Sequence, residues 1–146
     1  MLKIKKNLLA LVVLSLSLYS CSSSTDEPAP MAPEVSIIGN WQYTQDGSIA
    51  NNVEVLTNYV HASGCAKDYG QFLANNVFKD VYYQNPNCNM TVDPGTWSKT
   101  NNTLVVTIPN QSTTVTATIL TLTSTTLKFK YVQGQSTLLA VLTRIP

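Results

Sequence analysis

The run Ser36-Ile37-Ile38-Gly39-Asn40-Trp41-Gln42-Tyr43-Thr44 decides the fold. It predicts the first strand of a domain. Gly39 lets the chain enter that strand in close contact with its neighbours, and the large ring of Trp41 can form the floor of a core. We therefore expect the later strands to close around Trp41.

The chain after this run has the composition of a sheet. Thirteen of the 36 residues from Thr91 to Thr126 are threonine, which is β-branched and unfavourable in helices. Apolar side chains also recur at every second position, as in Leu104, Val106 and Ile108, which is typical of a strand with one buried face. These patterns predict an all-β domain.

Turn residues divide this part of the chain into about eight strands in meander order. Asn75-Asn76 and Asn101-Asn102 suit two-residue hairpins because asparagine tolerates positive φ. Further turns are predicted at Asp93-Pro94-Gly95, Ser124-Thr125 and Gln133-Gly134-Gln135. The strands predicted around these turns are 69–74, 77–84, 96–100, 103–109, 114–123, 126–133 and 136–145. The stretch 49–62 predicts a strand or a short helix. Sequential antiparallel strands of this kind form a barrel or a sandwich.

Length and charge limit the classes of partner. A chain of 146 residues suggests one domain. The net charge is +1, but the positive excess lies in Lys3, Lys5 and Lys6; without them six basic and eight acidic residues remain, so a chain starting at Cys21 carries −2. No basic patch is left for a phosphate backbone, and nucleic acid is excluded as a partner on this ground.

The first twenty residues, 1–20, have the pattern of an export signal. The three lysines precede an apolar stretch from Leu8 to Leu18, whose eleven residues are too few to span a bilayer. Leu18-Tyr19-Ser20-Cys21 then resembles the bacterial lipobox, with Tyr19 bulkier than usual at its position. The resemblance implies that Cys21 becomes the acylated first residue of the mature protein, anchored at ~0.8 kcal/mol per buried CH₂ group. A plain secretory signal with a chance cysteine is the alternative.

Residues 21–35 are interpreted as a flexible tether, because they are rich in serine and proline and have no apolar period. Asp26 and Glu27, shortly after Cys21, resemble the surface-export signals of some Gram-negative lipoproteins. The expected location is therefore the outer membrane, lipid-anchored through Cys21, with the domain in the periplasm or at the cell surface.

Three features of the domain resemble the lipocalin-like domains of Gram-negative bacterial lipoproteins, over Ile37 to Ile145. Gly39-Asn40-Trp41 matches the Gly-x-Trp of the first lipocalin strand, and Arg144 lies in the last strand, where lipocalins place an arginine that packs on that tryptophan. The third feature is the block Cys65-Ala66-Lys67-Asp68-Tyr69, Phe72, Cys88 and Gly95-Thr96-Trp97-Ser98.

The resemblance implies an antiparallel up-and-down meander of about eight strands that closes into a lipocalin-like β-barrel over residues 36–146. It also implies a barrel-closing contact between Trp41 and Arg144, since the first and last strands must pair to close the sheet. A small hydrophobic ligand is the implied cargo. From Ser36 the domain has only 111 residues, shorter than typical ligand-carrying lipocalins, so side chains can fill its interior.

The chain has three cysteines. With Cys21 acylated, Cys65 and Cys88 are left as a pair for a disulfide in an oxidising compartment, worth ~3 kcal/mol for a loop of this size. Metal ligation and redox chemistry are the alternatives, but the spacing fits neither, because there is no Cys-x-x-Cys and a metal site needs more ligands.

The sequence predicts no catalytic residue, no metal site and no cofactor. His61, the only histidine, is interpreted as a surface or loop residue; it could share a helical face with Cys65, but a metal would need a third ligand. A Gly-x-Ser-x-Gly nucleophile elbow is missing from the sequence. The acidic residues of the domain are isolated along the chain: Asp46, Glu54, Asp68, Asp80 and Asp93.

Aromatic residues are the candidates for ligand binding. They can grip an apolar or ring-shaped molecule, with the tyrosine hydroxyls for orientation. The alternative for any of them is a place in the core, favoured for Trp41, Phe72 and Phe129. Tyr82 and Tyr83 cannot both face inward, because adjacent strand residues point to opposite faces. The candidates are Tyr43, Tyr69, Phe78, Tyr82, Trp97 and Tyr131.

Two classes of function remain. The first is a membrane-anchored protein of the cell envelope that binds a small hydrophobic ligand. The second is an envelope or surface interaction protein, such as an inhibitor, adhesin or assembly accessory, with a filled barrel and a protein partner. An enzyme is disfavoured. An apolar internal cavity would favour the first class, and a packed interior with an exposed aromatic patch the second.

Overall fold

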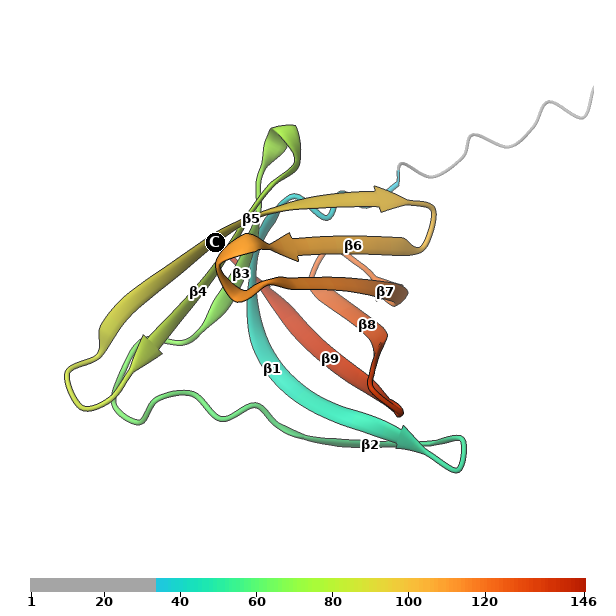
Figure 1. The fold of residues 1–146 in the computed structure, drawn as a ribbon, viewed down its shortest axis with the longest axis horizontal. Coiled ribbons are helices and arrows are strands. Elements are labelled where there is room, and N and C mark those ends of the chain that lie inside the picture. Colours follow the sequence, from blue (N-terminus) through green and yellow to red (C-terminus); the bar gives the residue numbers. More distant parts are fainter. Residues whose placement is uncertain (1–33) are drawn as a thin grey trace, which may run out of the picture. The chain divides into compact units, whose positions relative to one another are not determined.

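The protein is an all-β barrel in the computed structural model, which describes residues 34–146 (Figure 1). The expected signal peptide 1–20, the lipidated Cys21 and the tether up to residue 33 lie outside the described residues. No helix in the described part of the chain is long and apolar enough to cross a membrane. The elements are β1 (Gly39–Ala50), β2 (Val53–Asn58), β3 (Tyr69–Phe72), η1 (Ala74–Asn76), β4 (Val77–Gln84), β5 (Asn89–Thr100), β6 (Thr103–Ile108), η2 (Pro109–Gln111), β7 (Thr113–Leu122), β8 (Thr126–Gln133) and β9 (Ser136–Ile145).

Eight of these strands close the barrel. β3 to β9 follow one another as antiparallel neighbours, and β1 pairs with both β3 and β9, which joins the two ends of the sheet. The predicted closed up-and-down meander is therefore confirmed. β2 is a ninth strand that pairs only with the second half of β1. The register between β1 and β9 shifts between Tyr43 and Gln45, the kind of bulge that bends a barrel strand.

Asparagines form the tight turns, as predicted. Asn75, Asn76 and Asn101 all adopt positive φ, between 52° and 61°, a region that asparagine tolerates better than most residues. The stretch 49–62, open between strand and helix in the sequence, forms the end of β1 and the strand β2. Asn51 and Asn52 make the turn between them, with φ of 50° and 62°.

The turn predicted at Asp93-Pro94-Gly95 is wrong, because these residues lie inside β5. At Pro94 the strand pairs with β4, while its pairing with β6 begins only at Thr96. Proline is tolerated where a strand has a free edge, since its missing N–H leaves no ladder bond unmade. Gly95 fits the close approach of β6 that follows, because a Cβ there would overlap the carbonyl oxygen of Thr107.

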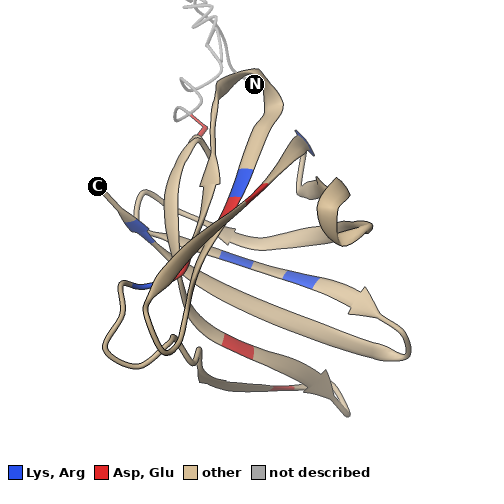
Figure 2. Ribbon diagram, turned by 60° about the vertical axis from the view of Figure 1, so that its left-hand side comes forward, with Lys and Arg blue, Asp and Glu red and all other residues tan. Residues whose placement is uncertain are grey.

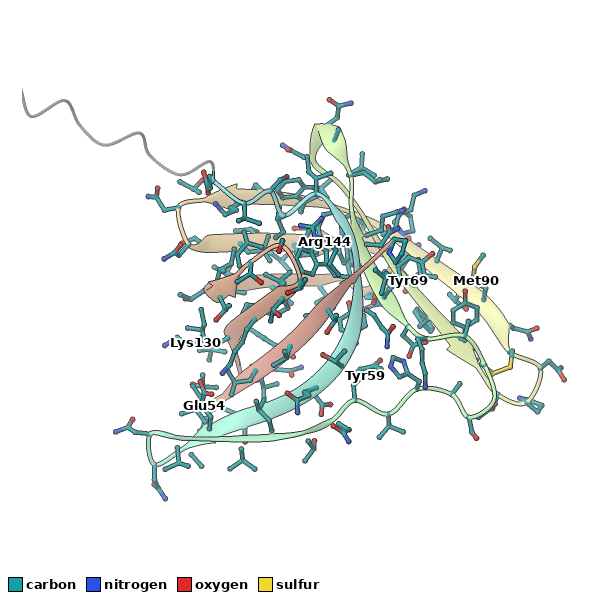
Figure 3. All side chains as sticks on the ribbon, turned by 180° about the vertical axis from the view of Figure 1, so that it is seen from behind. Glu54, Tyr59, Tyr69, Met90, Lys130 and Arg144 are labelled. Carbon is teal, nitrogen blue, oxygen red and sulfur yellow. A yellow bond between two sulfur atoms is a disulfide. The ribbon has the colours of Figure 1, made fainter. Side chains whose placement is uncertain are left out.

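One end of the barrel is closed by the segment Ser36–Ile38, which Trp41 and Arg144 hold in place. The Trp41 side chain is fully buried, and its Nε1 donates a hydrogen bond to the carbonyl of Ile37 at 2.7 Å. The Arg144 guanidinium lies 4.2 Å from the centroid of the Trp41 ring. It donates to the carbonyls of Ile38 at 2.7 Å and Ser36 at 2.6 Å. Figure 3 labels Arg144 near the end of β9. We call this region the closed end.

Gly39 makes the closed end sterically feasible. Its φ of +143° is rarely adopted by residues with a side chain, and a Cβ at this position would overlap Nη1 of Arg144. The glycine and the tryptophan of Gly39-Asn40-Trp41 therefore serve one contact: Trp41 supplies the ring, and Gly39 leaves room for the cation above it.

Candidate functional site

A cavity of about 250 Å³ lies in the barrel interior, and several of the buried core residues form part of its wall. Residues from seven strands, β1, β3, β4, β6, β7, β8 and β9, and from η2 form its wall, so only the closed barrel creates it. Its wall is mostly apolar and aromatic, and its polar groups come from a few residues. The lining residues are Tyr43, Gly70, Phe72, Phe78, Asp80, Leu104, Val106, Ile108, Gln111, Thr113, Val115, Ala117, Phe129, Tyr131, Ala140 and Leu142.

Asp80 is the charged group in this wall. It lies on the same face of β4 as Phe78, two residues earlier, because side chains alternate along a strand. The Tyr43 hydroxyl donates a hydrogen bond to Oδ1 of Asp80 at 3.0 Å. No other hydrogen bond reaches the Asp80 carboxylate from residues 34–146, so one carboxylate oxygen is left for another donor.

Burial raises the pKa of Asp80, although the hydrogen bond from Tyr43 acts against it, and the charges of Asp93 and Asp68 raise it further. A raised folded-state pKa means that the ionised carboxylate destabilises the fold as pH rises above the ordinary aspartate value of about 3.9. The pKa of Tyr43 is raised well above its usual range, chiefly by burial and then by the Asp80 charge, so Tyr43 remains a donor.

Asp93 is a second acidic residue next to Asp80, outside the cavity lining. It pairs directly with Asp80 across β4 and β5, and its side chain is nearly buried. Its Oδ2 accepts hydrogen bonds from Nε2 of Gln111 at 2.6 Å and from the Tyr82 hydroxyl at 3.3 Å. Like charges directly opposite on two strands are unfavourable, so a cation bound nearby would reduce the repulsion between Asp80 and Asp93.

The loop between β2 and β3 packs its own aromatic residues beside the cavity. Tyr59 of this loop, labelled in Figure 3, stacks on Tyr43, with ring centroids 5.2 Å apart. Burial, followed by the charge of Asp68, raises the pKa of Tyr59 to about 12. His61 contacts the edge of Tyr59, and its Nδ1 accepts the Asp68 backbone N–H at 3.0 Å. His61 is therefore in a loop, as expected, but its side chain is buried rather than at the surface.

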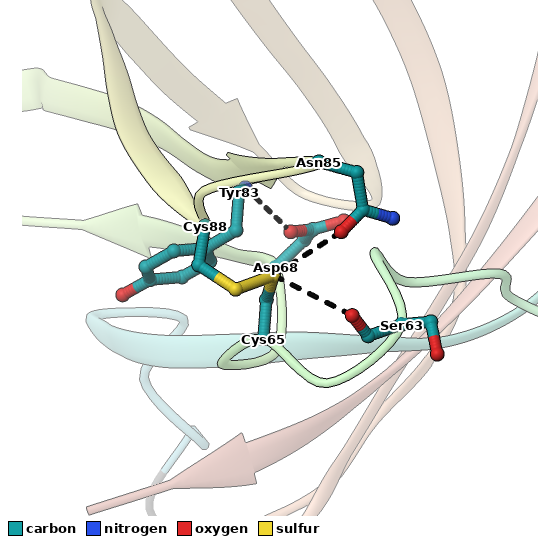
Figure 4. The surroundings of a disulfide bond; sticks show 6 residues. All are labelled: Ser63, Cys65, Asp68, Tyr83, Asn85 and Cys88. Atoms are coloured by element: carbon teal, nitrogen blue, oxygen red, sulfur yellow. Dashed lines mark hydrogen bonds between the residues drawn. A yellow bond between two sulfur atoms is a disulfide. The ribbon is translucent and has the colours of Figure 1, made fainter.

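The structure joins Cys65 and Cys88 by a disulfide, with a Cα–Cα distance of 5.3 Å (Figure 4). The bond fastens the loop after β2 to the turn between β4 and β5. Beside it, Oδ1 of the buried Asp68 accepts the backbone N–H of Tyr83 at 2.9 Å. The disulfide and this hydrogen bond thus hold the loop that carries Tyr59 against the barrel.

The six aromatic candidates divide into two sets. Tyr43, Phe78 and Tyr131 line the cavity, whereas Tyr69, Tyr82 and Trp97 do not, which corrects that part of the interpretation. Tyr69 alternates with the inward Gly70 on β3, and Tyr82 shares the face of Phe78 but lies further along β4, where its hydroxyl binds Asp93. Trp97 packs edge-on against Phe72 and donates to the Leu73 carbonyl at 2.9 Å.

The sequence did not single out Asp80 or Gln111 as site residues. Asp80 looked isolated along the chain, but it follows Phe78 by two residues in a strand whose limits were predicted correctly. That spacing is the signal that places both side chains on one face. Gln111 carried no such signal, because it lies in η2 between two strands.

No metal site is evident in the described part of the chain: residues 34–146 hold no group of three or more His, Cys, Asp or Glu side chains placed to bind a metal ion. Cys65 is oxidised in the disulfide, so it is not available as a ligand beside His61. The charged residues of the domain are few and scattered (Figure 2). Two lysine–glutamate ion pairs occur in the described residues, Lys99 with Glu34 and Lys128 with Glu54. None of these four residues lines the cavity.

Two of the comparisons with known proteins, the family model and the first solved structure below, agree with this architecture. The family model of the lipocalin-like domain matches residues 37–129. An uncharacterized protein from Bacteroides eggerthii has a similar structure, with a TM-score of 0.53 and 10% identity, over 75% of this chain and 100% of that one. A deswapped triple mutant of bovine odorant-binding protein gives a TM-score of 0.39 and 18% identity, over 73% of this chain and 72% of that one. No curated protein matches the sequence.

Proposed function

The chain belongs to the lipocalin-like domain family, and from this premise we propose that it binds a small, mainly apolar molecule in the cavity of its barrel. The observation that carries the proposal is the cavity itself, about 250 Å³ with a largely apolar and aromatic wall. Ligand pockets are usually about 300–1,000 Å³. The cavity is close to the lower end of that range, which favours a ligand of one ring or a short chain.

The cavity also supports one of the two classes of function that the sequence left open. A barrel filled by its own side chains would present only its outer surface, as an inhibitor, adhesin or assembly accessory does. The 111-residue domain keeps an interior space despite its short length, and this space supports small-molecule binding. Members of lipocalin-like families generally bind ligands rather than transform them, and we propose the same here: a binding protein and not an enzyme.

Filling the cavity is expected to weaken binding. Ala140 lines the cavity, so Ala140→Phe should weaken the binding of a small probe such as 2-phenylethanol by about tenfold or more, since tenfold corresponds to only ~1.4 kcal/mol. The matched control is Ala50→Phe, because Ala50 is exposed at the end of β1. Isothermal titration calorimetry measures both. Equal affinities for the two variants, or no binding to the unsubstituted protein, would contradict the proposal.

A complementary search for the natural ligand uses protein purified from its own host. Native mass spectrometry of that protein should show a co-purifying molecule of low mass. The Ala140→Phe variant, purified in the same way, should have lost it.

We further propose that the protein is anchored in the outer membrane through acylated Cys21, with its domain in the periplasm or at the cell surface. The pattern of the first 21 residues supports this. Cys21→Ser is expected to move the protein out of the membrane fraction and to remove the mass of the acyl chains from the mature protein. Ser22→Ala is the control that should change neither. A Cys21→Ser protein that keeps its mass and stays in the membrane fraction would overturn the proposal.

A further inference from the structure

One wall of the cavity carries an acceptor that the protein leaves partly unused. Asp80 is half-buried in the same wall as Phe78, and among residues 34–146 only Tyr43 donates a hydrogen bond to its carboxylate, at Oδ1. A carboxylate has about four acceptor positions. Because Asp80 also lines the cavity, its carboxylate can accept a further hydrogen bond from a ligand there.

Residues 34–146 also supply no cation to this carboxylate, since none of their ion pairs includes Asp80. Lys79 and Asp80 are neighbours on β4, so their side chains point to opposite faces of the sheet. The lysines in ion pairs within residues 34–146 bind Glu34 and Glu54, which do not line the cavity, and Arg144 is engaged at the closed end. The charges that affect Asp80 are instead those of Asp93 and Asp68, which have the same sign and help raise its pKa.

Aromatic rings share the cavity wall with this carboxylate. Tyr43, Phe129 and Tyr131 line the same cavity, and the faces of aromatic rings attract cations. A half-buried carboxylate with a free oxygen, a like charge opposite and aromatic rings alongside has the features of a receptor for a small organic cation. The same negative charges would disfavour an anionic ligand such as a fatty acid.

We propose that the ligand carries a protonated amine that pairs with Asp80, while a small ring or short alkyl group fills the apolar part of the cavity. This inference rests on the proposed function, since it names the chemical class of the molecule bound in the same cavity. Tyr43 positions the carboxylate by its hydrogen bond and leaves the second oxygen toward the amine.

The test compares three probes of similar size by isothermal titration calorimetry: 2-phenylethylamine, 2-phenylethanol and 3-phenylpropanoate. The unsubstituted protein should bind the amine at least about tenfold more tightly than the alcohol, because hydrogen bonds between charged groups are roughly twice as strong as neutral ones. The carboxylate probe should bind most weakly. Asp80→Asn keeps the shape of the side chain and should remove the preference for the amine, leaving the affinity for the alcohol within a factor of about three.

Glu54→Gln is the matched control, because it removes one negative charge from β2, outside the cavity lining, and should leave the preference unchanged. If the unsubstituted protein binds amine and alcohol equally, or if Asp80→Asn keeps the preference, this inference is overturned while the proposed function stands. If no probe binds, the cavity is not a binding site for molecules of this size, and both are overturned. The comparison of probes on the unsubstituted protein needs no variant to fold.

Discussion

Trp41→Ala is expected to lower the free energy of unfolding by ~3–5 kcal/mol, the range for removing a large buried aromatic side chain. The side chain is fully buried, and its Nε1 holds the carbonyl of Ile37. Its removal opens a cavity at the closed end and leaves that carbonyl without its donor. It also takes away the ring beneath the Arg144 guanidinium. Urea denaturation followed by circular dichroism measures the loss.

The contact with Arg144 can be separated from the rest of this effect by a double-mutant cycle. Trp41→Phe and Arg144→Ala, singly and together, should show a coupling of ~1–2 kcal/mol, as expected for a partly desolvated cation–π contact. Arg144→Lys should lose part of the stability, because it keeps the charge but not the planar fork that binds the Ser36 and Ile38 carbonyls.

The control cycle pairs Arg144→Ala with Trp97→Phe. Trp97 is the second tryptophan of the domain, and its ring packs on Phe72 instead. Its coupling with Arg144 should be close to zero. Additive losses for Trp41 and Arg144 would mean that their contact contributes nothing to closing the barrel.

Removing the disulfide should have the second large effect. Cys65→Ser with Cys88→Ser is expected to lower the free energy of unfolding by ~3 kcal/mol, because the bond closes a long loop and so restricts the unfolded chain; the two cysteines are 23 positions apart. The folded state should loosen mainly in the loop that carries Tyr59 and Asp68, which hydrogen exchange can locate.

Reduction of the unsubstituted protein by dithiothreitol is the control, and it should lower stability to the level of the double variant. Cys65→Ala with Cys88→Ala should agree with the serine pair, which shows that the lost bond rather than the new hydroxyls is responsible. A change below ~1 kcal/mol would show that the bond does not constrain the unfolded chain as proposed.

Much of the fold could be predicted because its local signals agree. The limits of β4, β8 and β9 match the predicted strands 77–84, 126–133 and 136–145. Asparagine turns and the period-two pattern act within a few residues, so one sequence reveals them. Pro94 led to a wrong prediction of a turn. A strand tolerates proline where no neighbouring strand pairs with it, and β6 does not pair with Pro94. No local pattern records which stretch of a strand lies at a free edge.

The candidate site was harder to predict because its contacts are made across the barrel. Asp80 and Tyr43 are 37 positions apart in sequence, and only barrel closure brings them together. The strand pattern places Asp80 on the face of Phe78 but cannot tell whether that face ends in a packed core or in a cavity. The same holds for Tyr82, which has the correct face but lies beyond the cavity lining.

The closed end also determines how the domain would bear a mechanical load. A pull on the chain before residue 34 enters the barrel through Ser36–Ile38, so it reaches the hydrogen bonds of Trp41 and Arg144 to this segment before the ladder between β1 and β9. We therefore expect the hydrogen bonds of Arg144 to this segment to bear such tension before the pairing between β1 and β9 does. If the chain is anchored at its N-terminus as proposed, we expect these hydrogen bonds to take up tension from the anchor before it reaches β1 and β9, which form part of the cavity wall.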